Sequence, residues 1–151
     1  MNVLEELKGA ETVGITGHIR PDGDCIGSCM GLYSYLKDNC PQLDVTVYLE
    51  TPGSEFHYIR DIDKIQTIPD IKKEYDVFFV LDCSSLDRIE PFHSCFENAK
   101  KTVCIDHHIS NGSFADVNVV DISKASVADM MINADSLFCI FKAAMEWLNS
   151  V

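Results

Sequence analysis

The feature that most constrains the fold is the run YDVFFVLD at residues 75–82, which is almost continuously apolar and ends on Asp82. Such a run is typical of a strand that is buried on both faces, as in a parallel sheet. Shorter apolar stretches recur along the chain, and they predict further strands at 12–18, 44–50, 101–106 and 114–121. We therefore expect a sheet of five strands.

Segments with helical periodicity separate these strands. Apolar side chains recur every three or four positions in residues 24–37 and again from Ser126 onward, where Ser126 and Asp129 are spaced like a capping box. Shorter helices are expected at 3–9, near 56–60 and at 91–100. Pro91 would occupy the first turn of the last of these. The alternation predicts an α/β domain, with a mostly parallel sheet and helices on both faces.

Length and charge limit the function. The chain has 151 residues, 46% of them hydrophobic, which suits one compact domain over residues 1–151. Twelve Lys and Arg residues against 24 Asp and Glu residues give a net charge of −12, so the surface should repel long nucleic-acid duplexes. Small anionic substrates stay compatible with this charge if bound cations reverse the field inside one cleft.

The cysteine pattern and the N-terminus indicate the compartment. Seven cysteines, odd in number and without a CxxC pair, fit neither a disulfide framework nor a zinc ribbon, and they favour a reducing cytoplasm. The N-terminal residues MNVLEELKGA resemble no secretion signal, and no stretch reaches the roughly 18 apolar residues of a membrane span. We expect a cytoplasmic protein that does not bind membranes.

Acidic and imidazole side chains follow four of the predicted strands. They are His18, Asp22, Asp24, Asp82, Asp106, His107, His108 and Asp121. In a parallel sheet the carboxyl ends of the strands meet at one edge, where ligands collect. The sequence therefore predicts a single functional site at that edge.

Four of the carboxylates, those of Asp22, Asp24, Asp82 and Asp121, would then share a partly dry cleft. Each contact between like charges at about 4 Å costs several kcal/mol at an effective dielectric near 20, so a positive charge must lie among them. Two divalent cations would balance four carboxylates. Mixed carboxylate and imidazole ligands suit Mn²⁺ best, with Fe²⁺, Co²⁺ or Mg²⁺ as alternatives, and argue against a structural zinc.

The spacing within HIRPDGD, residues 18–24, supports two ions. Asp22 and Asp24 lie two apart across a glycine turn and can face neighbouring ions, while His18 reaches the first. Metals about 3.5–4 Å apart stabilise the attacking and leaving oxygens of a phosphoryl transfer. This is the pattern of a hydrolase site.

The segments HIRPDGD, VLDCSS, CIDHH and VVD resemble, in order and context, the four motifs of the DHH family of phosphoesterases. The resemblance runs from about residue 10 to about residue 130 and is greatest to the bacterial oligoribonuclease and 3′-phosphoadenosine 5′-phosphate phosphatase branch. It implies that His18, Asp22 and Asp82 hold one Mn²⁺. It implies that Asp24, Asp82, His107 and Asp121 hold the other, with Asp82 bridging the two ions.

The resemblance also implies catalytic roles and a reaction. His108 would face the substrate phosphate, and Asp106 would orient the histidine pair without binding the metal itself. The implied reaction is the hydrolysis of short RNA oligonucleotides or of 3′-phosphoadenosine 5′-phosphate. Cyclic-dinucleotide phosphodiesterase and pyrophosphatase activities are alternatives within the same chemistry.

The sequence departs from the family pattern in two places. The family's second, substrate-binding domain does not follow in this sequence, and the paired serine expected after the fourth motif is replaced by Ala125, Ser126 and Val127. These departures motivate an alternative of another class, a module that binds metal or nucleotide without efficient turnover. Trp147 and Leu148 at the end of the last helix would normally be covered, which suggests a second domain or a homo-oligomer.

Simpler interpretations exist for single residues. Asp24 also suits the N-cap of a helix that begins at Cys25. Asp116 competes with Asp121 for the fourth motif, because the register of the last strand is inferred. Cys83 and Cys104 lie near the expected cleft but are best explained as small buried apolar residues.

Overall fold

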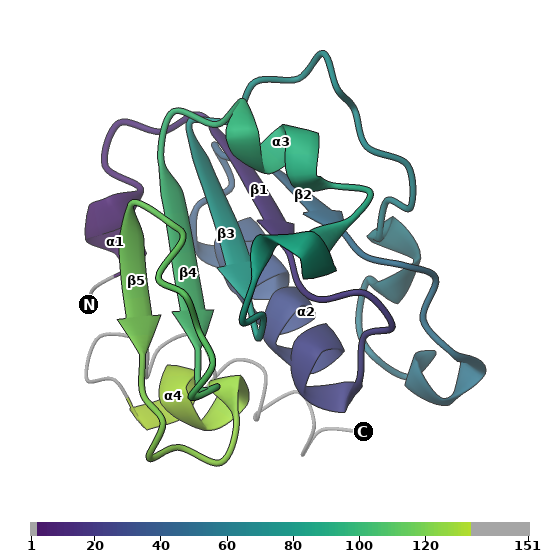
Figure 1. Cartoon of the computed structure of the whole chain (residues 1–151). Helices are drawn as coiled ribbons and strands as arrows, with labels where there is room; N and C mark the ends of the chain where they lie inside the picture. The colour runs from purple at the N-terminus through teal and green to yellow at the C-terminus, as the bar shows by residue number, and fades with distance from the viewer. Residues whose placement is uncertain (1–2, 134–151) are drawn as a thin grey trace.

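The computed structural model describes residues 3–133 and contains one five-stranded sheet, in which every strand is parallel to its neighbours (Figure 1). The strand order is β2-β1-β3-β4-β5. The strands are β1 (Thr12–Thr16), β2 (Asp44–Tyr48), β3 (Val77–Leu81), β4 (Thr102–Asp106) and β5 (Val117–Val120). All five predicted strands are confirmed, and β3, the centre of the sheet, is buried along its whole length.

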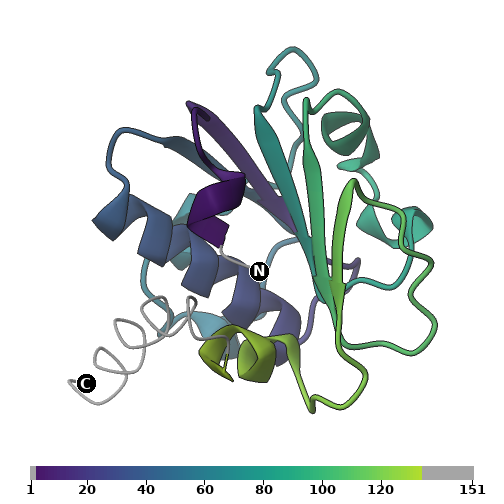
Figure 2. The same ribbon diagram turned by 90° about the vertical axis from the view of Figure 1, so that its left-hand side faces the viewer.

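Helices cover both faces of the sheet, as the sequence predicted. Figure 2 shows α1 (Val3–Glu6), α2 (Gly23–Asn39) and α4 (Val127–Asn133) on one face, and α3 (His93–Glu97) with the 3₁₀ turn Leu86–Ile89 on the other. Alternate side chains of β3 divide between the two layers. Phe79 packs in the cluster with α2, whereas Phe78 and Val80 pack with α3. The protein therefore has an α/β fold with two core layers.

Several boundaries differ from the prediction. The helix expected near 56–60 is a pair of short 3₁₀ turns, Ser54–Phe56 and Ile62–Lys64. Pro91 precedes α3 instead of lying in its first turn, because the Phe92 N–H bonds to the Ile89 carbonyl and the chain is still turning there. The predicted continuation of the last helix beyond residue 133 lies outside the described residues. No helix in the described range 3–133 is long and apolar enough to cross a membrane.

Two matching pairs of side chains hold the strand starts together. The Thr12 N–H and hydroxyl donate to Asp76, while the Asp76 N–H donates back to the Thr12 hydroxyl. Thr102 and Asp116 repeat the same three hydrogen bonds between β4 and β5. These pairs lie at the edge opposite the carboxyl ends, so Asp116 has a structural role and does not compete with Asp121.

We predict that Asp76→Asn lowers the free energy of unfolding by about 1–3 kcal/mol at pH 7, the usual worth of hydrogen bonds to a charged group. Lys100 and the N–H groups of Glu11 and Thr12 hold the pKa of Asp76 well below its ordinary value. Its stabilising contribution is therefore present above about pH 4 and is lost as the pH falls further. Urea unfolding across pH 3–7 measures it.

The matched control is Asp87→Asn, which removes the same charge from an exposed position. Equal stability of the Asp76 and Asp87 variants at pH 7, or a gap between them that widens toward low pH, would contradict the proposed role of the Asp76 pair.

Candidate metal centre

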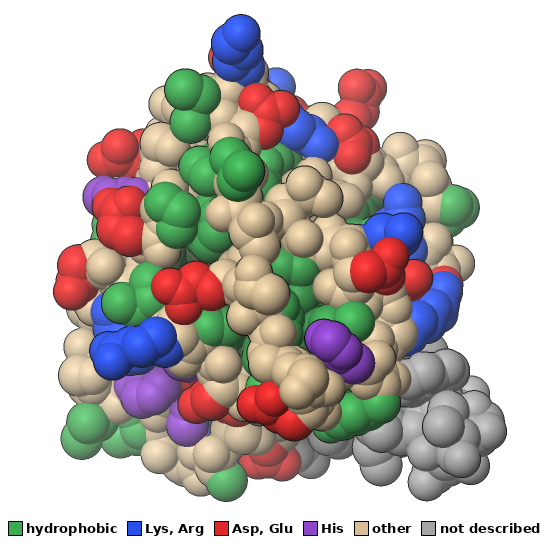
Figure 3. Space-filling view, turned by 90° about the vertical axis from the view of Figure 1, so that its right-hand side faces the viewer, with side chains coloured by type: hydrophobic (Ala, Val, Ile, Leu, Met, Phe, Trp, Pro, Cys, Tyr) green, Lys and Arg blue, Asp and Glu red, His purple; other side chains and the backbone are tan. Residues whose placement is uncertain are grey.

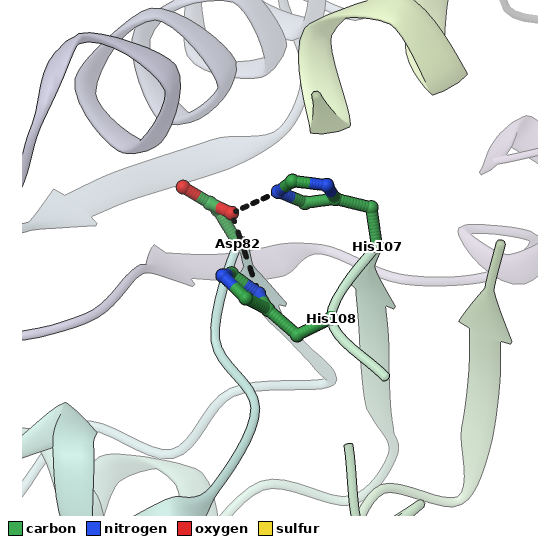
Figure 4. Close-up of side chains that lie close together, drawn as sticks. All are labelled: Asp82, His107 and His108. Atoms are coloured by element: carbon green, nitrogen blue, oxygen red, sulfur yellow. Dashed lines mark ion pairs between the residues drawn. The ribbon is translucent and has the colours of Figure 1, made fainter. Parts of the chain in front are cut away.

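The carboxyl ends of the strands bring five of the predicted site residues together. Two groups have ligand atoms that all lie within 4.8 Å of one another: His18, Asp22 and Asp82, and Asp82, His107 and His108. Asp82 directly follows β3 and belongs to both groups, and Figure 4 shows one of its carboxylate oxygens facing both the His107 and the His108 ring. The edge predicted from the sequence is thus the edge at which these side chains converge.

Asp82 is the central side chain. One carboxylate oxygen, Oδ2, lies 3.6 Å from His18 Nε2, and the other, Oδ1, lies 3.3 Å from His107 Nε2. The residue is only 2% exposed, and its Oδ1 has no hydrogen-bond partner among the described residues. A buried, unpaired carboxylate oxygen is costly and demands an explanation. A cation between Asp82 and the histidines would supply the missing partner.

The backbone at Asp82 is also unusual. Its φ is 55°, in the left-handed region, which few residues other than glycine adopt without cost. Its N–H still donates to the Ile105 carbonyl at 3.0 Å, so the turn stays joined to β4. This conformation directs the carboxylate toward the histidines at the end of the neighbouring strand. Sequence patterns gave no indication of it.

The second nitrogens of His18 and His107 show how their rings are held. His18 Nδ1 lies 2.8 Å from the Ile19 carbonyl, and His107 Nδ1 lies 3.3 Å from the Lys124 carbonyl. A carbonyl can only accept a hydrogen bond, so each Nδ1 carries a proton and each Nε2 is the nitrogen left to bind a second proton or a metal ion. Both Nε2 atoms face Asp82. Metal-binding histidines are typically oriented by such backbone contacts.

His108 is held differently. Its Nδ1 lies 2.6 Å from Oδ1 of Asp106, a carboxylate with no exposed surface. The same Nδ1 is 3.8 Å from Asp82, so the hydrogen bond to Asp106 is the dominant contact. Asp106 therefore orients His108, while His107 is oriented by the Lys124 carbonyl. The other nitrogen of His108, Nε2, takes no part in this contact, and the substrate role predicted for His108 stays a prediction.

Electrostatics at the site favour added positive charge. Interaction with the Asp82 carboxylate raises the pKa of His18 to about 9, against the opposing effect of burial. The raised pKa means that the cluster attracts a proton when no other cation is bound. A divalent ion would compete with this proton for the same nitrogen. The donor set, imidazole nitrogens and carboxylate oxygens, fits the Mn²⁺ or related ions expected from the sequence.

Asp22 and Asp24 both cap helices, but Asp24 does not cap the helix that the sequence suggested. Asp22, not Asp24, is the N-cap of α2, because its Oδ1 accepts the N–H groups of Asp24 and Cys25 at 3.1 Å each. The alternative interpretation of Asp24 as the N-cap of a helix beginning at Cys25 is therefore wrong. Asp22 also lies 3.8 Å from His18 Nε2, so the cap borders the metal-binding group.

Asp24 caps a different helix. Its carboxylate accepts the N–H of Val127 at 2.8 Å and the N–H of Ala128 at 3.0 Å, at the start of α4. Its Oδ2 also lies 3.7 Å from His107 Nε2, although Asp24 is in neither of the two groups. Asp24 thus joins α4 to the edge of the site. At the same end of α4, the Asp129 N–H donates to the Ser126 hydroxyl, as the predicted cap requires.

Asp121 lies directly after β5, but its carboxylate points to its own turn. Oδ1 accepts the Ser123 N–H at 3.0 Å and the Ser123 hydroxyl at 2.6 Å, and these contacts lower the pKa of Asp121. The residue is in neither group of convergent side chains among residues 3–133. Metal binding by Asp121, as by the other predicted ligands, stays a prediction.

The sequence analysis did not single out Asn111. Its side-chain amide donates a hydrogen bond to Asp106, the carboxylate that orients His108. The local signal, an asparagine followed by Gly112, indicates no more than a turn.

Comparison with known proteins identifies the class. Residues 12–145 match the model of the DHH family, N-terminal domain, and the chain belongs to this family. A solved structure with a similar fold is that of an exopolyphosphatase-related protein from Bacteroides fragilis, with a TM-score of 0.76 and 22% identity over 93% of this chain and 42% of that chain. At this identity the likeness establishes the fold alone.

Two relatives are bifunctional oligoribonuclease and PAP phosphatase NrnA proteins. The protein of Thermus thermophilus is 33% identical over 136 residues, which are 85% of this chain and 38% of the relative. The protein of Bacillus subtilis is 25% identical over 121 residues, 80% of this chain and 37% of the relative. The chain thus spans about two fifths of the length of these curated relatives.

We predict that amide hydrogen exchange distinguishes the helix cap formed by Asp24 from the cap formed by Asp22. Asp24→Ala should speed amide exchange at Val127 and Ala128 by about five- to tenfold, because losing an N-cap costs about 1 kcal/mol. Exchange at Cys25 should stay unchanged. Asp22→Ala should give the opposite pattern and serves as the matched control. If Asp24→Ala leaves the α4 amides unaffected, the contact between Asp24 and α4 does not hold that helix.

Proposed function

We propose that the chain is the catalytic domain of a metal-dependent phosphoesterase that hydrolyses short oligoribonucleotides, 3′-phosphoadenosine 5′-phosphate, or both, with two bound Mn²⁺ ions. The observation that carries the proposal is the buried Asp82 carboxylate between His18 Nε2 and His107 Nε2, with one oxygen that has no hydrogen-bond partner within residues 3–133. Membership of the DHH family and the names of the NrnA relatives support the reaction class and the substrates.

The proposed ligands follow the two sides of Asp82. His18, Asp22 and Asp82 would hold one ion, and Asp24, Asp82, His107 and Asp121 would hold the other. Mg²⁺, Fe²⁺ and Co²⁺ suit the same donors. Divalent ions bound there supply Lewis-acid activation of water and neutralise charge on the phosphate.

The remaining side chains bind and orient the substrate. His108 presents Nε2 because Nδ1 is bonded to Asp106, and in its protonated form this ring can donate a hydrogen bond to a phosphate oxygen. Asp106, wholly buried, keeps the ring in one orientation. The exposed Asp22 lies on the open side of the site, where a substrate would enter.

Surface charge favours short substrates. The net charge of −12 opposes the approach of long polyanions, and the Lys and Arg side chains in Figure 3 are interspersed with Asp and Glu. No continuous basic stripe crosses the described part of that face. A dinucleotide or mononucleotide needs only the local field of the site. The proposed location is the reducing cytoplasm, because the cysteine pattern of the sequence favours it.

We predict that the purified chain, loaded with Mn²⁺, hydrolyses a 5′-phosphorylated RNA dinucleotide or 3′-phosphoadenosine 5′-phosphate. Asp82→Ala should lower the rate by about a thousandfold or more, since the several kcal/mol that metal ions contribute correspond to such a factor. Asp87→Ala, which removes an exposed carboxylate, should retain full activity.

Cyclic dinucleotides and pyrophosphate are assayed in parallel, and turnover of these alone would reassign the substrate. Two bound Mn²⁺ ions per chain with no turnover of any substrate would contradict hydrolysis and support a binding module.

A further inference from the structure

The side chain of Asn111 connects two parts of the site. Its amide nitrogen Nδ2 lies 2.8 Å from Asp106 Oδ2, 3.2 Å from the Cys83 carbonyl and 3.5 Å from the Cys104 sulfur. Its oxygen Oδ1 accepts the Ser113 N–H at 2.8 Å. Because a backbone N–H can only donate, Oδ1 must face Ser113 and the NH₂ group must face Asp106. The amide therefore has one defined orientation.

Asp106 depends on this contact. Its carboxylate is fully buried, and a buried carboxylate is costly unless its oxygens are hydrogen-bonded. Oδ1 is bonded to His108 and Oδ2 to Asn111. The contact with Asn111 keeps the Asp106 carboxylate from rotating. The orientation of the carboxylate in turn determines where His108 Nδ1 can bond to it.

We propose that Asn111 is a positioning residue, which locks Asp106 and thereby holds His108 with Nε2 toward the substrate. The proposal deepens the phosphoesterase function and rests on it for the catalytic consequence, but the positioning itself does not require activity. Asn111 acts through Asp106 and does not touch the substrate.

The bond to the Cys83 carbonyl extends this role to the turn after Asp82. Backbone bonds also hold that turn, from the Gly112 N–H to the Ser84 carbonyl and from the Asp82 N–H to the Ile105 carbonyl. The position of Asp82 therefore survives loss of the Asn111 amide, whereas the orientation of Asp106 does not. Asn111 variants should accordingly affect His108 more than the metal ligands.

Histidine tautomers give a direct readout. In the metal-free protein, at a pH where the ring is neutral, ¹⁵N NMR should find His108 protonated at Nδ1. Asn111→Ala should convert this signal to a mixture of the Nδ1–H and Nε2–H tautomers. His18 and His107 should keep a proton on Nδ1 in both proteins, because backbone carbonyls accept from that nitrogen. Asn111→Asp should disturb His108 further, because it places a second carboxylate against Asp106.

Asn118→Ala is the matched control. Asn118, in β5, also uses both ends of its amide, but on the backbone of Ala115, which precedes that strand. In the Mn²⁺-loaded enzyme, Asn111→Ala should lower kcat by about 10–100-fold, the usual cost of losing a supporting contact behind a site, with KM and Mn²⁺ affinity unchanged. Asn118→Ala should lower neither kcat nor the His108 Nδ1–H signal.

Two outcomes overturn the proposal. One is a wild-type His108 protonated at Nε2, which is decided without any variant and therefore even if the variants fail to fold. The other is a lower melting temperature in Asn111→Ala with unchanged His108 tautomers, which would make the residue merely structural. If the wild-type protein is inactive but Asn111→Ala still shifts the His108 tautomers as described, the phosphoesterase function is refuted and the positioning role of Asn111 stands.

Discussion

The structure depends on one buried carboxylate. Asp82 directly follows the central strand, is almost inaccessible to solvent and lies between two imidazole nitrogens, and one of its oxygens has no hydrogen-bond partner in the described part of the chain. Apolar residues on both faces of β3 force it into this position, because the strand cannot move without exposing the core. The cost of burying a charge there is accepted only if something positive shares the site. The flanking histidines and the proposed chemistry both follow from this requirement.

Side-chain contacts around Asp82 divide into those that face a cation and those that orient the groups facing it. The histidines on either side are held by backbone carbonyls, so their orientation is independent of Asp82. Asp22 and Asp24 do two things each, since both cap helices and both border the cluster. The positions of the helices and the geometry of the site are therefore linked, because the first amides of α4 donate to Asp24, which is also a proposed ligand.

Much of this arrangement could be predicted from the sequence. Continuous apolar runs such as 75–82 indicate buried parallel strands, and a parallel sheet necessarily gathers the strand ends where His18, Asp82 and His107 occur. The order of the four sequence motifs also indicated the protein family. The strands, the two-faced α/β layering and the convergence of five site residues were predicted correctly for this reason.

Other features could not be predicted because they depend on contacts between distant segments. The bonds from Asp24 to the α4 amides join residues 103 and 104 positions apart, and no local pattern distinguishes that cap from the one predicted for α2. The positive φ of Asp82 and the contact of Asn111 with Asp106 likewise arise from the packed structure. The position of Asp121, bonded within its own turn, is a third case.

The most direct test of the account is electron paramagnetic resonance of the Mn²⁺-loaded protein. If Asp82 bridges two ions, the spectrum should be that of an exchange-coupled pair, and Asp82→Asn should abolish the coupling. A spectrum of isolated Mn²⁺ ions alone in the fully loaded wild type, or coupling that persists unchanged in Asp82→Asn, would contradict it.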